Sequence, residues 1–253
     1  MISKNLTKHI LALHSKKNRD EKSLFIVEGE KIIIEFISSD KYKIDKVVGT
    51  NQFKSKYFEI LHSKSISFIE VSEDELKKIS SQTNPNQALA IVHKLNVNSS
   101  PINSVTGIAL YLDDIRDPGN FGTIIRIADW FGINQVFCSK NTTELYNPKV
   151  LQATMGAILR VNVTYVSIDL LLKENLNTKV YGAVLNGNDI YKTKLENGII
   201  VIGNESNGIS EPILNLINDP ITIPSSKING SESLNAANAC AIICSEFHRQ
   251  LNY

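Results

Sequence analysis

The first residues that could do chemistry lie in a polar loop, Asp113–Gly122, between an apolar run and a predicted helix. Asn120 stands just before that helix, where an asparagine often serves as the N-cap. Arg126 lies within the helix but off its apolar stripe, so its guanidinium could reach back over the loop. An exposed arginine can equally be a solvated charge. The pair therefore offers either hydrogen-bond donors for a bound group or a helix cap and a surface charge.

A second polar loop, Ile202–Ile209, follows another apolar run. Gly203 would let a ligand approach the backbone closely, Gly208 permits a positive φ angle, and Glu205 between them supplies a carboxylate. A flexible turn would explain the same glycines. No Gly-Lys-Ser/Thr occurs here, and no Gly-x-Gly-x-x-Gly follows the first strand of this part, so the sequence has neither a P-loop nor a dinucleotide fingerprint.

A third stretch joins a strand-like run, Pro220–Ile223, to a predicted last helix, Leu234–Leu251, through a polar loop. Ser233 has the position and the residue type of an N-cap for that helix. Asn235 is a weak helix former that prefers helix ends and binding sites. Packing of the small residues that follow could also account for this segment.

The cysteines indicate core packing rather than metal binding. Cys138, Cys240 and Cys244 are odd in number and lie in apolar stretches, as buried thiols do. Cys240 and Cys244 are one helical turn apart, but no histidine or second cysteine pair completes a metal-binding set. We therefore expect no metal site.

The elements that must position the three loops form an α/β pattern. The run Gly107–Leu112 is apolar on both faces, as expected of a strand buried in a parallel sheet. Apolar runs then alternate with helical stretches, which predicts an α/β layered fold with its working residues in loops at the carboxyl ends of strands. The other predicted elements of this part are strands at Gln135–Ser139, Leu159–Val166, Lys179–Leu185 and Ile199–Gly203, and helices at Phe121–Phe131, Pro148–Ala157, Ile168–Asn175 and Glu211–Asn218.

The pattern of the N-terminal part predicts a smaller α/β unit. Ser72 and Glu75 have the spacing of a capping box, which predicts a helix over Ser72–Ser80. Residues 95–106 combine Asn, Ser and Pro without bulky periodicity, as linkers do. We expect domains at 1–94 and 107–253, joined by this linker. The remaining predicted elements are strands at Leu24–Val27, Lys46–Gly49, Ser67–Val71 and Ala88–His93 and a helix at Lys31–Ser38.

The net charge of +1 hides a difference between the two parts. Residues 1–94 hold 16 Lys and Arg against 12 Asp and Glu, whereas residues 95–253 hold 11 against 14. Lys16, Lys17 and Arg19 belong to a basic cluster that could bind RNA phosphates. A solvated helix face is the alternative interpretation.

Composition and termini favour a soluble protein of the cytoplasm. The chain is 42% hydrophobic and 21% charged, near globular averages. No segment approaches the ~18 apolar residues of a membrane-spanning helix. The first residues lack the apolar run of a secretory signal. We therefore expect no membrane association and no export.

Together, the three loops resemble the signature motifs of the SpoU (TrmH-like) family of RNA methyltransferases in the SPOUT superfamily. The motifs are similar to Asp117-Pro118-Gly119-Asn120-x-Gly122 with Arg126, then Gly203, Glu205 and Gly208, then Ile223-Pro224 and Ser233-Leu234-Asn235. Lys16-Lys17-Asn18-Arg19 and Phe25–Gly29 are similar to the family's RNA-binding extension, so the resemblance spans nearly the whole chain. Two departures are Ser225, where relatives usually have methionine, and the longer loop Ser226–Glu232.

The resemblance implies transfer of a methyl group from S-adenosylmethionine to a ribose 2′-hydroxyl in structured RNA, with ribosomal RNA favoured over transfer RNA. It implies a homodimer that binds no DNA, and a C-terminal parallel sheet tied in a trefoil knot beside a smaller N-terminal α/β domain. Open alternatives are a tRNA methyltransferase, a base methyltransferase, a non-catalytic RNA-binding protein on the same fold and an unrelated α/β metabolic enzyme.

The resemblance also assigns roles to residues. It implies catalytic roles for Arg126, Asn120, Glu205, Ser233 and Asn235, cofactor contacts from Leu185, Gly203, Ile223 and Leu234, and RNA contacts from Lys16, Lys17 and Arg19. Family mechanisms make the motif arginine the proton acceptor. A guanidinium is protonated at ordinary pH, so an orienting and stabilising role for Arg126 is easier to defend.

Overall fold

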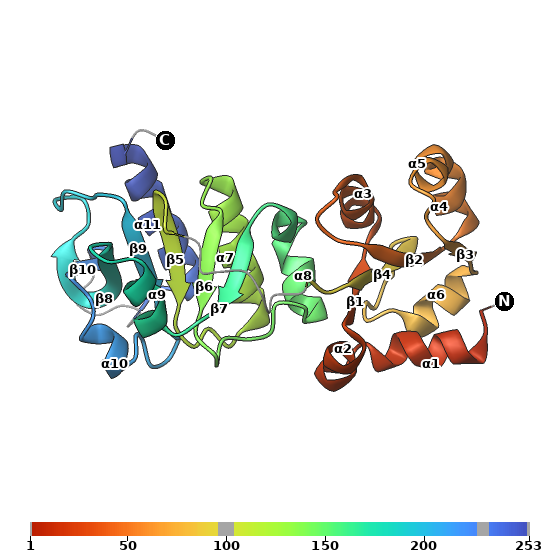
Figure 1. The fold of residues 1–253 in the computed structure, drawn as a ribbon, viewed down its shortest axis with the longest axis horizontal. Coiled ribbons are helices and arrows are strands. Elements are labelled where there is room, and N and C mark those ends of the chain that lie inside the picture. The colour runs from red at the N-terminus through yellow and green to blue at the C-terminus, as the bar shows by residue number, and fades with distance from the viewer. Residues whose placement is uncertain (1, 96–103, 227–232, 252–253) are drawn as a thin grey trace. The chain divides into compact units, whose positions relative to one another are not determined.

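The computed structural model describes residues 2–95, 104–226 and 233–251, which form two compact units. The first unit comprises residues 1–96 together with 146–159, and the second comprises 97–145 together with 160–253. Most of the predicted linker, 95–106, lies outside the described residues, as does most of the predicted long loop 226–232. Each unit is a sheet flanked by helices (Figure 1).

A four-stranded mixed sheet forms the centre of the first unit. β4 runs antiparallel to both β1 and β2, and β2 is parallel to β3. β4 is buried along nearly its whole length because it is an inner strand with helices on both faces of the sheet. In spatial order the strands are β1 (Leu24–Glu28), β4 (Ala88–His93), β2 (Ile44–Gly49) and β3 (Phe68–Glu70).

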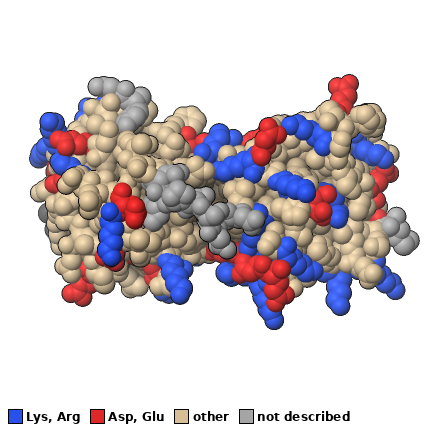
Figure 2. All heavy atoms as spheres, in the orientation of Figure 1, with Lys and Arg blue, Asp and Glu red and all other residues tan. Residues whose placement is uncertain are grey.

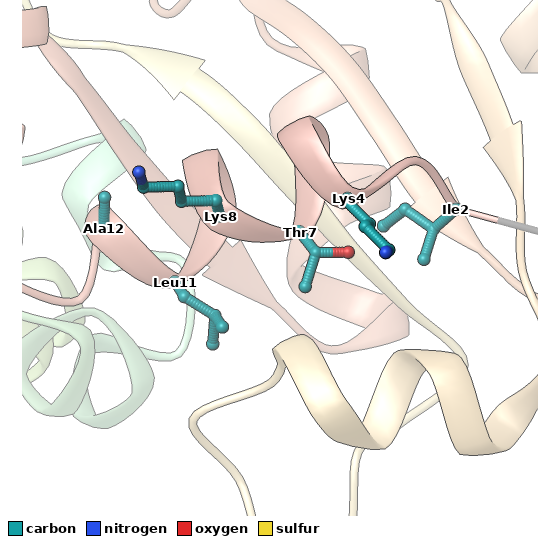
Figure 3. Close-up of a pocket in the computed structure, with 6 residues that line it drawn as sticks. All are labelled: Ile2, Lys4, Thr7, Lys8, Leu11 and Ala12. Atoms are coloured by element: carbon teal, nitrogen blue, oxygen red, sulfur yellow. The ribbon is translucent and has the colours of Figure 1, made fainter.

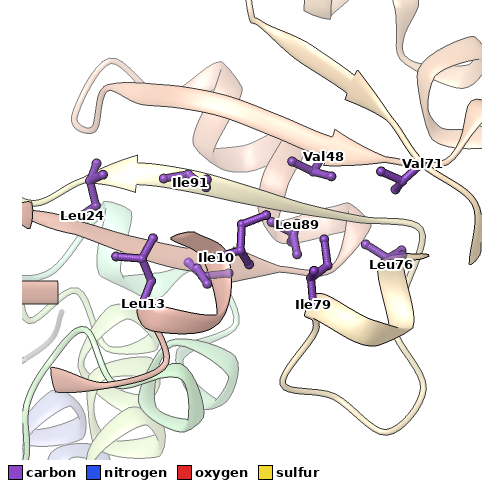
Figure 4. Packing of buried hydrophobic residues seen from close by; sticks show 10 residues of the cluster. Ile10, Leu13, Leu24, Val48, Val71, Leu76, Ile79, Leu89 and Ile91 are labelled. Carbon is purple, nitrogen blue, oxygen red and sulfur yellow. The ribbon is translucent and has the colours of Figure 1, made fainter. Parts of the chain in front are cut away.

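Two helices, α1 (Lys4–Ala12) and α6 (Glu73–Ile79), pack their apolar sides on one face of this sheet (Figure 4). The cluster that they form with the strands contains Ile10, Leu13, Leu24, Ile26, Val48, Val71, Leu76, Ile79, Leu89 and Ile91. The other helices of residues 1–95 are α2 (Lys16–Lys22), α3 (Glu30–Ser38), α4 (Asn51–Lys56) and α5 (Phe58–Ser63). Sequence reasoning predicted α3 and α6 but missed the others, three of which are no more than seven residues long.

The predicted capping box at the start of α6 is confirmed. The Glu75 backbone N–H donates to Ser72 Oγ at 3.2 Å, and the Ser72 backbone N–H donates to Glu75 Oε2 at 3.0 Å. The Ile2 backbone N–H also donates to the Glu75 carboxylate, at 2.9 Å. These bonds hold the pKa of Glu75 below its usual value, because its charged form accepts backbone N–H groups.

A six-stranded parallel sheet forms the centre of the second unit, which confirms the predicted α/β fold with a parallel sheet. β9 and β5 are its two central strands and are buried at every position. In spatial order the strands are β10 (Asp219–Thr222), β8 (Lys179–Asp189), β9 (Gly198–Ile202), β5 (Ile108–Leu112), β6 (Gln135–Cys138) and β7 (Asn162–Tyr165).

The helices of the second unit begin at positions that correct two predictions. α7 (Pro118–Trp130) begins three residues before the predicted Phe121, because Asp117 accepts the Asn120 backbone N–H at 2.7 Å and serves as the N-cap. α11 (Ala236–Leu251) begins after Asn235, so Ser233 is not its N-cap. The remaining helices of this unit are α9 (Ile168–Glu174) and α10 (Glu211–Leu214), the latter shorter than the predicted Glu211–Asn218.

One segment of the C-terminal half of the chain, Tyr146–Leu159, belongs to the first unit by its contacts. It holds α8 (Pro148–Thr154) and the 3-10 helix η1 (Ala157–Leu159), which replaces the start of the predicted strand Leu159–Val166. Tyr146 packs on Phe25 with 4.6 Å between ring centroids, and its hydroxyl accepts the Leu95 backbone N–H at 3.3 Å. The sequence shows no composition shift at this segment that could have predicted its packing.

The cysteine prediction is confirmed for burial. Cys138, Cys240 and Cys244 are all buried, and burial raises the pKa of the Cys138 thiol well above its ordinary value. Among the described residues, no group of three or more His, Cys, Asp or Glu side chains is placed to hold a metal ion. No helix within the described part of the chain has the length and hydropathy needed to cross a membrane.

Candidate functional site

The first two polar loops begin side by side because their strands are neighbours. Leu112 at the end of β5 pairs with Ile202 at the end of β9, and the Asp113 backbone N–H donates to Ile202 O at 2.9 Å. The loops that follow, here called loop one (residues 113–117) and loop two (residues 203–210), therefore leave the same edge of the sheet. This is the carboxyl edge, where ligands bind in α/β folds.

A chain of side-chain hydrogen bonds joins all three predicted motifs. Asn120 Nδ2 donates to Glu205 Oε1 at 2.8 Å, and Asn235 Nδ2 donates to Asn120 Oδ1 at 2.8 Å. Asn120 thus uses both ends of its amide and sits between loop two and the start of α11. Three of the five residues predicted to be catalytic are brought together in this way.

The helix starts explain why these asparagines are placed as they are. Asp117 caps α7, so the Asn120 side chain is not used as the cap and is turned toward the neighbouring loops. Asn235 lies at the cap position of α11, where its Oδ1 accepts the backbone N–H groups of Ala237 at 3.0 Å and Asn238 at 3.3 Å. Its Nδ2 remains for Asn120. One asparagine therefore both caps a helix and contributes to the site.

Loop two is a tight turn that needs its glycines. Asn204 and Gly208 exchange two backbone hydrogen bonds of 2.9 and 3.0 Å, and Gly208 has a φ of +67°. A Cβ added at Gly203 would lie 2.3 Å from the Gly208 carbonyl carbon and 2.4 Å from the Ile209 nitrogen. These distances are far below van der Waals contact. Only glycine fits at position 203 without moving the loop.

Sequence reasoning missed two residues that hold loop two. The Asp113 carboxylate is buried and accepts the Ser210 backbone N–H at 2.8 Å. Asn204 Nδ2 donates to the Asp114 carbonyl oxygen at 2.8 Å. The signal for Asp113 was an acidic residue directly after a run apolar on both faces. Asn204 had no comparable signal beyond its place between Gly203 and Glu205.

Arg126 does not join the hydrogen-bonded chain. Its side chain is exposed on α7 and forms no hydrogen bond or ion pair with any part of the chain that the structure describes. Asp129, three residues on, is instead paired with Arg160 through Nε and Nη2 contacts of 2.9 to 3.0 Å. Arg126 is therefore an available cation beside the Asn120 loop.

The residues predicted to contact the cofactor include unusually exposed apolar side chains. Leu185 is 67% exposed and Leu234 is 50% exposed, whereas Ile223 and Gly203 are partly buried. Thr222 Oγ1 donates to the Leu185 carbonyl oxygen at 3.0 Å and so ties the end of β10 to β8. Exposed leucines such as these suit the flat, largely apolar face of a bound ligand.

The remaining predicted site residues differ in their surroundings. Ser233 is exposed and contributes no hydrogen bond within the described chain. Lys16 and Lys17 are exposed but paired, with Asp20 at 2.6 Å and Glu21 at 3.9 Å. On the face seen in Figure 2, basic side chains of the first unit are interspersed with acidic ones. Any phosphate would have to compete with these neighbouring carboxylates for the lysines.

The Arg19 side chain is buried and has a structural role. An RNA contact would need an exposed side chain. Arg19 is 3% exposed, and its Nη1 donates to the carbonyl oxygens of Leu13 at 3.0 Å and His14 at 2.8 Å. These carbonyls lie at the C-terminal end of α1, where helix carbonyls lack intrahelical partners. The structure thus argues against an RNA contact from Arg19, because its guanidinium is used to close this helix end.

A second basic site lies on α1. Lys4 and Lys8 are exposed, and neither takes part in an ion pair or hydrogen bond among the described residues. They line a shallow hollow on the surface of α1 (Figure 3). Its lining consists of Ile2, Lys4, Thr7, Lys8, Leu11 and Ala12. These two lysines, next to the exposed Leu11, are more accessible to an anion than the paired lysines of α2.

Both parts of the chain match families of known proteins. Residues 107–245 match the SpoU rRNA Methylase family, and residues 4–90 match the MRM3-like substrate binding domain. The 23S rRNA (guanosine(2553)-2′-O)-methyltransferase RlmP of Bacillus subtilis is 28% identical over 237 residues, which cover 91% of each chain.

Solved structures are similar over the full length. A protein described as an RNA methyltransferase of the TrmH family, from Porphyromonas gingivalis, is 37% identical with a TM-score of 0.85, covering 99% of each chain. An AdoMet-bound rRNA methyltransferase from Sinorhizobium meliloti is 26% identical with a TM-score of 0.84, covering 99% of this chain and 97% of its own. Similarity therefore extends through both units.

Proposed function

Because this chain belongs to the SpoU rRNA methylase family, we propose that it transfers a methyl group from S-adenosylmethionine to a ribose 2′-hydroxyl of ribosomal RNA. The relatives support both halves of this statement. The B. subtilis relative is named as a 23S rRNA 2′-O-methyltransferase, and the S. meliloti relative is described as bound to AdoMet. The same reaction on transfer RNA is an outcome that the assay below separates.

The observation that carries the proposal is the hydrogen-bonded chain Glu205–Asn120–Asn235. It fixes one residue from each motif at the carboxyl edge of a parallel sheet. A fixed set of donors and acceptors can orient a ribose hydroxyl without rearranging during the reaction, which is the main advantage of a preorganised site. Positioning of two reactants can contribute about 7–11 kcal/mol in favourable systems.

The residues present fit the cofactor. We assign its contacts to Leu185, Ile223 and Leu234 on the apolar side and to Gly203 through the backbone. The fit rests on two features. Leu185, within β8, is 67% exposed and Leu234, before α11, is 50% exposed, and the loop at Gly203 is too tight for any side chain. When bound, the group supplies an electrophilic methyl on a sulfonium, so the protein needs no metal or nucleophile of its own.

Arg126 is assigned to the substrate side of the reaction. As an exposed guanidinium without a protein partner among the described residues, it is available to an RNA phosphate or to the ribose oxygen. It stays protonated, so its part is to orient the hydroxyl and stabilise negative charge as the hydroxyl proton passes to an RNA phosphate or to water. Glu205, Asn120 and Asn235 keep the neighbouring loops in place, and Ser233 lies two residues before Asn235.

The proposal extends to the whole chain. The first unit would bind the RNA, and the 2′-hydroxyl target would let the enzyme distinguish RNA from DNA. The C-terminal unit would be tied in the trefoil knot of its superfamily, and two copies would assemble as a homodimer in the cytoplasm. Light scattering of the purified chain tests the dimer, since a monomeric mass at working concentrations would contradict it.

The proposal is tested by transfer of labelled methyl groups from S-adenosylmethionine to total RNA of a strain that lacks this protein. We expect label in ribosomal RNA with the wild-type chain and its loss with Arg126→Ala and with Asn120→Ala. Thr123→Ala is the matched control, because Thr123 is exposed on the same helix and outside the motifs. No incorporation with the wild-type chain, together with no cofactor binding by calorimetry, would contradict the proposal.

A further inference from the structure

We propose that Asn204 is a positioning residue of this site, because its side chain ties loop two to loop one and at the same time shapes loop two. The inference rests on the proposed function and deepens it. Asn204 does not belong to the motif residues assigned above. It lies between Gly203, which we assign to the cofactor, and Glu205, which bonds to Asn120.

The two polar atoms of the Asn204 side chain have separate tasks. Its Oδ1 accepts the backbone N–H groups of Ser206 at 2.9 Å and Asn207 at 3.0 Å, which holds the turn within loop two. Its Nδ2 donates to the Asp114 carbonyl oxygen at 2.8 Å, which joins loop two to loop one. The cross-loop bond therefore depends on the amide nitrogen alone.

The acceptor side of this bond is held firmly. Asp114 has a φ of +56°, an uncommon conformation for a residue other than glycine. Its backbone N–H donates to Ser139 Oγ at 2.8 Å, and its carboxylate accepts Arg116 Nε at 2.9 Å. The Asp114 carbonyl oxygen is thus a fixed point to which Asn204 can be attached.

Loop two is fastened to loop one at both of its ends. At the far end, the buried Asp113 carboxylate accepts the Ser210 backbone N–H at 2.8 Å. At the near end, Asn204 is bonded to the Asp114 carbonyl oxygen, and its neighbour Glu205 is held separately by Asn120. Loss of the Asn204 bond would let Gly203 shift and would leave Glu205 held by its bond to Asn120. Cofactor affinity and turnover should therefore both fall.

The replacement Asn204→Asp tests this point, because it keeps the size of the side chain and an acceptor oxygen for Ser206 and Asn207. It replaces only the donor, and it places a carboxylate oxygen against the Asp114 carbonyl. Asn207→Asp is the matched control. It adds the same charge to the same loop at an exposed side chain that takes no part in the hydrogen bonds of the described residues.

Calorimetry on the full chain should show S-adenosylmethionine binding about tenfold weaker for N204D than for N207D, the size of effect expected from one lost hydrogen bond. The turnover number should fall in the same direction. The midpoints of thermal unfolding of the two variants should agree within about 4 °C.

The pH dependence separates positioning from a general loss of structure. As the pH falls toward the carboxyl range, about pH 4 to 5, the introduced carboxyl becomes protonated and can again donate to the Asp114 carbonyl. The affinity ratio between N207D and N204D should therefore shrink on acidification. Should N204D unfold at the assay temperature, Asn204→Ser against Asn207→Ser makes the same comparison without added charge.

Equal cofactor affinity and equal turnover for N204D and N207D would overturn the assignment. A loss in N204D that does not change with pH would also overturn it, because a lost donor predicts recovery. A wild-type chain that binds no S-adenosylmethionine is a different failure, since it removes the proposed function itself and this inference with it.

Discussion

The polar groups of the two units are used in different ways. In the second unit, uncharged amides of Asn120, Asn204 and Asn235 form short, specific hydrogen bonds between loops that are far apart in sequence. In the first unit, lysine is the most common charged residue, and several lysines are paired with nearby carboxylates. The amides fix the positions of the loops, whereas the lysines contribute a positive electrostatic potential. We expect reaction rate to depend on the first arrangement and RNA affinity on the second.

The largest effect should follow from breaking the amide chain at its centre. Asn120→Ala removes both the donor to Glu205 and the acceptor for Asn235. Loss of a preorganised donor in an active site typically lowers turnover by about 10²–10³-fold. The rate of methyl transfer at saturating RNA and cofactor measures it. A decrease of RNA affinity with unchanged turnover would place Asn120 in substrate binding instead.

The next largest effect should come from a side chain in loop two. Gly203→Ala places a carbon 2.3 Å from the Gly208 carbonyl carbon, so the loop must move. We expect cofactor affinity to fall by about tenfold or more, a loss of at least about 1.4 kcal/mol. Calorimetric titration with S-adenosylmethionine checks this, with exposed Ser206→Ala as the control. Unchanged affinity would mean that the loop has room which the structure does not show.

Arg19 distinguishes a structural cation from a binding cation within the first unit. Arg19→Met leaves the Leu13 and His14 carbonyls without their donor. The free energy of unfolding should fall by about 1–3 kcal/mol. Urea unfolding gives this value, and Lys16→Met, at an exposed paired lysine, should change it by less than about 0.5 kcal/mol. An equal free energy of unfolding for both variants would contradict the structural role and make Arg19 a candidate for RNA contact again.

The smallest effect should be the difference in RNA affinity between variants of the unpaired lysines of α1 and variants of the paired lysines of α2. Lys4→Ala with Lys8→Ala should weaken RNA binding and lower the slope of log affinity against log salt by about one for each phosphate that is no longer bound. Lys16→Ala with Lys17→Ala should do less, because Asp20 and Glu21 already compete for those lysines. Filter binding at several salt concentrations measures both pairs. Equal slopes would show that the pairing of Lys16 and Lys17 with carboxylates does not matter for RNA.

The sequence was sufficient for the parts of the fold that follow from local pattern. Apolar runs predicted the two central strands β5 and β9, and a capping box predicted α6. Helix starts were harder, because Asp117, Asn120, Ser233 and Asn235 all have residue types that can cap. Which one does so depends on the chain around it. The short helices α2, α4 and α5 have too few residues for periodicity to be read.

The site residues that belong to spaced motifs could be predicted from the sequence. Those whose role depends on tertiary contacts could not. Asn120, Glu205 and Asn235 were predicted together and are joined by hydrogen bonds. Asn204 could not be predicted, because its partner is a backbone carbonyl 90 positions away. The burial of Arg19 was missed for a related reason, since a basic cluster in sequence does not reveal which member turns inward.

The most direct test of the central claim is to digest labelled ribosomal RNA to nucleosides after reaction with the wild-type chain and to identify the labelled species by mass spectrometry. The account predicts label in a single nucleoside methylated on the ribose 2′-oxygen, and none with Asn120→Ala. Label on a base with the ribose unmodified would contradict the claim that this site methylates the 2′-hydroxyl.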